Sequence, residues 1–166
     1  MKKLLPLKSI FILLIFLSID SLFSEKCQRD IPEATLRSDF PLKITSKYSK
    51  SKNTFLETFT FNSQQMIVIE NKGCESYWIE YFFKFPINGK INSYSEIIKS
   101  LSLINKYNES GINISMIIKI LKNSEEKNII NKDIKISDNE FGEYFRLEKK
   151  TEKSKIIYSL SAIIGL

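Results

Sequence analysis

Three closely spaced runs of strand-forming residues place the strongest restriction on the fold of this chain. Residues 54–61 (TFLETFTF), 66–70 (MIVIE) and 76–85 (SYWIEYFFKF) are rich in aromatic and β-branched side chains. The segments between them, 62–65 and 71–73, contain the Asn, Ser and Gly typical of turns, and Pro86 ends the third run. Because short connections join antiparallel neighbours, the three runs predict an antiparallel meander.

One amphipathic helix is expected after the meander, from Ser93 to about Asn108. Ser93 and Glu96 have the capping-box spacing, in which each side chain satisfies a free backbone N–H at the start of a helix. Apolar side chains then recur at helical spacing: Tyr94, Ile97, Ile98, Leu101 and Ile104. The helix should end before Gly111 and pack on the sheet.

Alternation returns beyond the helix and predicts further strands. Apolar residues occupy every second position from 112 to 120, which favours a strand, although a helix over residues 116–123 is the alternative. Strands near residues 129–136, 144–148 and 155–164 complete the pattern. The sequence therefore predicts an α+β fold, with about six to seven antiparallel strands in the order β-β-β-α-β-β-β-β and one amphipathic helix packed on the sheet.

The beginning of the chain has the pattern of an export signal. Lys2, Lys3 and Lys8 precede an apolar run over residues 9–17, and the small residues Ser21 and Ser24 follow it. That run is shorter than the roughly twenty residues that span a bilayer. We therefore expect a cleaved signal peptide at 1–24, a mostly irregular lead-in at 25–53 with a short strand at 42–44, and a single α+β domain at 54–166. The mature protein would be secreted or periplasmic, without a transmembrane anchor.

Cysteine usage agrees with export. The chain has two cysteines, Cys27 and Cys74, and both follow the expected cleavage point. A pair of cysteines in an oxidising compartment predicts one disulfide, which would contribute about 4 kcal/mol to stability by the chain-entropy estimate. Lipid attachment at Cys27 is the alternative, but Glu25 and Lys26 stand where that processing requires small residues.

Missing residue types exclude several classes of function. The chain has no histidine, so a Ser-His-Asp or Cys-His nucleophile system cannot be built, and neither can a zinc site containing histidine. Two cysteines cannot form a four-thiolate site, and five glycines show no phosphate-binding loop. The net charge of +6 is spread along the chain, which together with export argues against nucleic acid. We expect no cofactor, no metal and no catalytic residue.

Alternation in the third run separates two sets of side chains. Tyr77, Ile79, Tyr81, Phe83 and Phe85 share one face. The other face carries Trp78, Glu80, Phe82 and Lys84. In a central strand both sets can belong to the core. Glu80 and Lys84 suggest instead that the Trp78 face is partly wet, so these four residues are the candidate binding site for a protein or glycan partner.

These observations favour an exported, non-catalytic binding or interaction protein. One alternative is a small carboxylate-dependent hydrolase that uses Glu57 or Glu80. Glu57 shares a strand face with Phe55, Phe59 and Phe61, although acids on strands of small domains usually lie at a wet edge. A structural component of the cell envelope is the other alternative.

Overall fold

A seven-stranded antiparallel sheet forms the centre of the computed structural model, which describes residues 31–72, 77–88, 92–137 and 142–165. The strands are β1 (Thr45–Ser49), β2 (Thr54–Phe61), β3 (Gln65–Lys72), β4 (Tyr77–Pro86), β5 (Asp133–Ser137), β6 (Glu143–Glu152) and β7 (Lys155–Ile164). The helices are α2 (Ser93–Tyr107), α3 (Ile114–Lys122) and α4 (Glu126–Ile129). The α+β class and the antiparallel sheet predicted from sequence are confirmed.

The strand order β1-β2-β3-β4-β7-β6-β5 places β4 at the middle of the sheet. Strands β1 to β4 form a meander of neighbouring antiparallel pairs. The chain then passes through the helices to β5 at the far edge and returns through β6 and β7, so that β7 pairs with β4. The C-terminal strand β7 therefore lies inside the sheet, between β4 and β6, and not at an edge.

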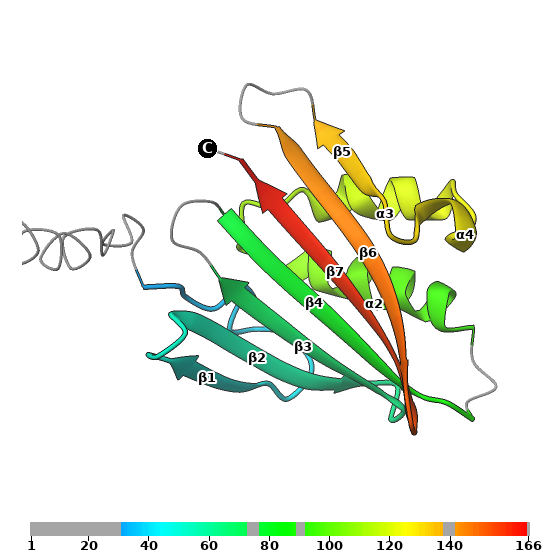
Figure 1. Ribbon diagram of the computed structural model, residues 1–166. Helices are drawn as coiled ribbons and strands as arrows, with labels where there is room; N and C mark the ends of the chain where they lie inside the picture. Colours follow the sequence, from blue (N-terminus) through cyan, green and yellow to red (C-terminus); the bar gives the residue numbers. More distant parts are fainter. Residues whose placement is uncertain (1–30, 73–76, 89–91, 138–141, 166) are drawn as a thin grey trace, which may run out of the picture.

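Helices α2 and α3 lie together on one face of the sheet (Figure 1). Between the helices and the sheet is a continuous apolar core, and its fully buried members include Ile67, Ile69, Ile79, Phe83, Ile97, Leu101, Ile104, Ile117, Leu121 and Leu160. Burial of side chains of this size, at about 1.5–3 kcal/mol each, is the main stabilising contribution to the fold. The two-layer arrangement leaves the second face of the sheet without a described helix over it.

The meander forms where the sequence predicts it. Strand β2 begins and ends as expected, and β3 and β4 differ from the predicted runs by one or two residues at their ends. Asn62 and Ser63 in the β2–β3 turn have φ values of 55° and 54°, in the left-handed region that tight hairpin turns use. This turn fixes the register, in which Phe61 is opposite Gln65.

The strand prediction for residues 112–120 is wrong, because this segment forms helix α3. Ile114, Ile117, Ile118 and Leu121 are buried, and their spacing of three, four and seven is helical. Asn113 supplies the start signal, since its side chain accepts a hydrogen bond from the Met116 N–H at 3.1 Å. The prediction of one helix was therefore also wrong; the part of the chain that the structure describes contains three. A strand near residues 129–136 is found in part, as β5.

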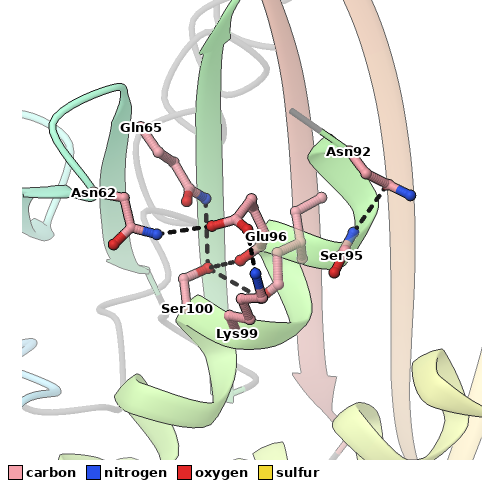
Figure 2. Close-up of polar contacts among 8 residues, drawn as sticks. Asn62, Gln65, Asn92, Ser95, Glu96, Lys99 and Ser100 are labelled. Carbon is pink, nitrogen blue, oxygen red and sulfur yellow. Dashed lines mark hydrogen bonds and ion pairs between the residues drawn. The ribbon is translucent and has the colours of Figure 1, made fainter. Parts of the chain in front are cut away.

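The cap of α2 differs from the predicted capping box by one residue. Asn92 is the N-cap, and its side chain accepts a hydrogen bond from the Ser95 N–H at 3.2 Å. Glu96 instead receives hydrogen bonds from Asn62 in the β2–β3 turn at 2.8 Å and from Lys99 at 2.7 Å (Figure 2). Because of the Asn62 contact, Glu96 fastens the first turn of α2 to the hairpin.

A buried contact strengthens the same junction. The Gln65 amide donates to the Ser100 hydroxyl at 3.4 Å, and that hydroxyl donates to the carbonyl oxygens of Glu96 and Ile97 (Figure 2). Gln65 and Ser100 are 2 % and 0 % exposed. The first half of α2 is thus held against β3 by polar contacts as well as by apolar packing.

The lead-in lies along the end of α2 and the edge of the sheet. It has no strand at 42–44; the strand β1 begins at Thr45 instead. The backbone N–H of Arg37 donates to Tyr107 at 2.9 Å, and Phe40 stacks edge-on against Phe59 at a centroid distance of 4.9 Å. The predicted signal peptide at 1–24 and both members of the predicted Cys27–Cys74 disulfide lie outside the described residues.

Candidate functional site

Strand β4 separates its side chains between the two faces of the sheet as the alternation predicts. Under the helices it buries Ile79, Tyr81, Phe83 and Phe85. On the opposite face it presents the four candidate residues, which are all partly exposed: Trp78, Glu80, Phe82 and Lys84. The structure therefore places the candidate site at the middle of the sheet, on the face away from α2 and α3 (Figure 1).

We call this face the open face. Strand register shows that its side chains include Leu56, Thr58, Thr60, Met66, Val68, Glu70, Lys72, Trp78, Glu80, Phe82, Lys84, Tyr144, Arg146, Glu148, Lys150, Ile157, Ser159, Ser161 and Ile163. A solvated face of an antiparallel sheet is normally polar. Here large apolar side chains are interspersed with charges, and Met66 and Tyr144 are 42 % and 43 % exposed. This mixture is typical of surfaces that bind other molecules.

A row of uncharged side chains, with the apolar pair Val68 and Phe82 at its centre, crosses the open face. Val68 of β3 is opposite Phe82 of β4, which in turn is opposite Ser159 of β7. Thr58 of β2 continues the row beyond Val68. Side chains directly opposite one another on paired strands lie about 5 Å apart, so this row forms one contiguous strip with Phe82 at its middle.

Two carboxylates and one ammonium group lie beside this row. Glu70 and Glu80 are opposite each other on β3 and β4, and both form ion pairs with Lys72. The Glu70–Lys72 distance is 3.2 Å, and Glu80 also accepts a hydrogen bond from the Ser161 hydroxyl at 3.2 Å. Partial burial disfavours the charged ammonium, but the carboxylates outweigh that effect and raise the pKa of Lys72. Lys72 therefore stays charged at neutral pH.

Trp78 is part of this cluster. The Lys72 ammonium lies over its ring, 5.1 Å from the centroid, in a cation–π contact. Such a contact holds the ring in place, and the residue as a whole is partly exposed. The cluster of Glu70, Lys72, Trp78 and Glu80 is therefore an ordered polar and aromatic patch and not a set of independent surface side chains.

Charges elsewhere on the open face differ in their pairing. Arg146 of β6 binds Glu148 at 2.9 Å and Asp133 of β5 at 3.3 Å, which raises the pKa of its guanidinium. Lys84, in contrast, forms no ion pair within the part of the chain that the structure describes. On the open face, β4 thus has an excess of carboxylate groups near Glu80 and, among the described residues, an ammonium group without an ion pair at Lys84.

Glu57 lies on the face that the helices cover and is 2 % exposed. Its carboxylate accepts hydrogen bonds from the Thr35 N–H at 2.7 Å, the Thr35 hydroxyl at 2.6 Å and the Leu36 N–H at 3.3 Å. These bonds attach the lead-in to β2. Because side chains alternate along paired strands, Glu57 and Glu80 are on opposite faces and cannot flank one scissile bond.

Two clefts lie away from the open face. One, of about 540 Å³, is bordered by the lead-in, β1 and β2, and Glu57 and Glu109 contribute to its walls. The other, of about 510 Å³, is formed around α4 and β6. In that second cleft Glu126 accepts hydrogen bonds from Lys149 at 2.8 Å and from Tyr158 at 2.7 Å. Burial opposes ionisation there, but these donors prevail and lower the pKa of Glu126.

Neither cleft contains a grouping of acids suited to a metal. Within residues 31–72, 77–88, 92–137 and 142–165, three or more potential metal ligands never come together. Over the same residues, every helix is too short or too polar to traverse a bilayer.

The sequence alternation placed the four β4 candidates on one face, as in the structure, but it did not identify the residues that contact them. Alternation in β3 puts Val68, Glu70 and Lys72 on one face, but which β4 residues they meet depends on the register. Ser161 could not be assigned at all, because the pairing of β7 with β4 joins segments about eighty residues apart. Comparison with known proteins adds no further assignment: no family model, no curated protein and no solved structure matches this chain.

Proposed function

We propose that this protein is an exported, non-catalytic interaction protein that binds a protein or glycan partner through the open face of its sheet. The observation that carries the proposal is the strip of uncharged side chains with the apolar pair Val68 and Phe82 at its centre, on a face that no described helix covers. Water contact with such a strip is unfavourable by about 25 cal/mol for each Å² of apolar surface, so a partner that covers it gains affinity. The export half of the proposal comes from the leader-like residues 1–24.

The polar cluster beside the strip supports recognition rather than catalysis. Glu80 contacts Lys72 and Ser161, and Glu70 contacts Lys72, so both carboxylates are held in an ordered cluster on the surface of the open face. An ordered arrangement of charges next to an apolar centre resembles the polar rim of a binding surface, which sets orientation and partner choice. Trp78, held by Lys72, adds an aromatic surface suited to a sugar ring or an apolar side chain.

Photo-crosslinking in cells that produce the protein tests the proposal. A benzophenone amino acid at Phe82 inserts into nearby C–H bonds, so it captures protein and glycan partners alike. The matched control carries the same group at Asn105, an exposed position on α2. We expect adducts from position 82 well above those from position 105. Equal yields at the two positions, in variants whose circular dichroism matches the wild type, would overturn the proposal.

A further inference from the structure

Two residues of β4 with opposite charges stand at equal distances from the centre of the open face. Glu80 and Lys84 lie two residues on either side of Phe82, about 6.8 Å along the strand in each direction. All three side chains belong to the same face. Reversing the direction of the strand therefore exchanges an acidic position for a basic one.

The net charges of the two ends are also opposite. At the Glu80 end, Glu70 and Glu80 share a single ammonium group, that of Lys72, so one negative charge is left over. At the Lys84 end, the strand neighbours are Met66 and Ile157, which are uncharged, and Lys84 has no ion pair among the described residues. One surplus carboxylate and one unpaired ammonium thus stand at equal distances from Phe82.

We propose that the partner of the open face is a second copy of this chain, related by a two-fold axis that lies midway between the two stacked sheets and runs across the strands, parallel to the row containing Phe82 and directly over it. This inference rests on the proposed function, since it names the partner of the same surface. In this arrangement each Lys84 lies against Glu80 and Glu70 of the other copy, and the row of Val68 and Phe82 packs on itself. Two sheets stacked in this way are about 10 Å apart, a distance that long side chains fill.

The other two-fold arrangement is less favourable. An axis parallel to the strands, between β4 and β7, keeps the strand direction and places Lys84 against Ile157 and Glu80 against Ser161. That would remove an unpaired ammonium from water without a counter-charge, which is costly. In the proposed arrangement Arg146 comes opposite Lys150, but Arg146 already has Asp133 and Glu148 as partners, so this contact is not an uncompensated repulsion.

Analytical ultracentrifugation of the purified protein tests the inference through a charge exchange. We expect a reversible monomer–dimer equilibrium for the wild type. Lys84→Glu should raise the dimer dissociation constant at least tenfold, because it places like charges together twice in each dimer. Glu80→Lys should do the same, and an equimolar mixture of the two variants should dimerise again. Lys43→Glu, an equal charge change at an exposed position of the lead-in, is the control and should leave dimerisation unchanged.

The mass of the protein in solution and the molecules crosslinked at Phe82 test the second copy and the proposed function separately. A wild type that stays monomeric up to about 200 µM, or a Lys84→Glu variant that dimerises like the Lys43→Glu control, would overturn the second copy as partner. If crosslinking at Phe82 nevertheless captures a different molecule, the proposed function stands and only the partner is wrong. Should Glu80→Lys fail to fold, Glu70→Lys supplies the reciprocal charge, and failure of that mixture to dimerise would also contradict the inference.

Discussion

Removing the Glu57 carboxylate should destabilise the fold strongly, although this residue is remote from the open face. In Glu57→Ala the lead-in loses three hydrogen bonds to an ionised acceptor, and the N–H groups of Thr35 and Leu36 are left without their partner. Hydrogen bonds to charged groups contribute about 1.5–3 kcal/mol each. Because the freed lead-in can rehydrate in part, we expect a loss of about 3–5 kcal/mol in the free energy of unfolding.

Urea unfolding at pH 7 and 25 °C measures this loss. With a slope of about 2 kcal/mol per molar urea, the midpoint should fall by about 2 M. Thr35→Val removes only the hydroxyl donor and should cost about 1–1.5 kcal/mol. Glu109→Ala, which removes an exposed acid of the same cleft, should stay within about 0.5 kcal/mol of the wild type. A Glu57→Ala variant as stable as Glu109→Ala would refute the anchoring role of Glu57.

Three further predictions concern the helices. Asn92→Ala should lower the free energy of unfolding by about 1 kcal/mol in thermal unfolding, because Asn92 is the N-cap of α2, whereas Ser93→Ala should have little effect. A larger loss for Ser93→Ala than for Asn92→Ala would show that Ser93 is the N-cap, as the capping-box spacing predicts. Leu121→Ala should cost about 2–5 kcal/mol, and Ile120→Ala clearly less, because only Leu121 is fully buried; equal losses would argue against the orientation of α3. Hydrogen bonds from Lys99 and Asn62 lower the pKa of Glu96, although burial of the carboxylate acts in the opposite direction. The ionised Glu96 therefore stabilises the fold above the unfolded-state pKa of about 4.3, and this stabilisation is lost as the pH falls through the pKa of the folded state. The stability difference between wild type and Glu96→Gln should therefore shrink between pH 7 and pH 3 in urea titrations, and a constant difference would contradict this.

Most of the sheet could be predicted from sequence because its signals are local. Alternation, turn residues and Pro86 define β2, β3 and β4, and β7 begins and ends where the pattern predicts. Helix α3 could not be separated from a strand, since isoleucines at 112, 114, 118 and 120 satisfy a period of two while Ile114, Ile117, Ile118 and Leu121 satisfy a period of 3.6. Tertiary packing decides between the two periods, and it is not visible in the sequence.

The candidate site shows the same division. The period of two along β4 is enough to put Trp78, Glu80, Phe82 and Lys84 on one face, and the structure places them so. Their chemical setting depends on strand order. Lys72 and Glu70 meet Glu80 through the β3–β4 register, and Ser161 meets it because the last strand of the chain inserts beside β4. Such non-local pairings have no signature in a single sequence.

Fluorescence of Trp78 offers the most direct test that the open face is the surface through which this protein associates. The chain contains one tryptophan, so acrylamide quenching reports on this face alone. We predict that quenching decreases as the wild-type protein is concentrated, in step with its increase in mass, and that Lys84→Glu keeps the quenching of the dilute protein. Quenching that is independent of concentration while the mass increases would show that association uses another surface, and would contradict the account.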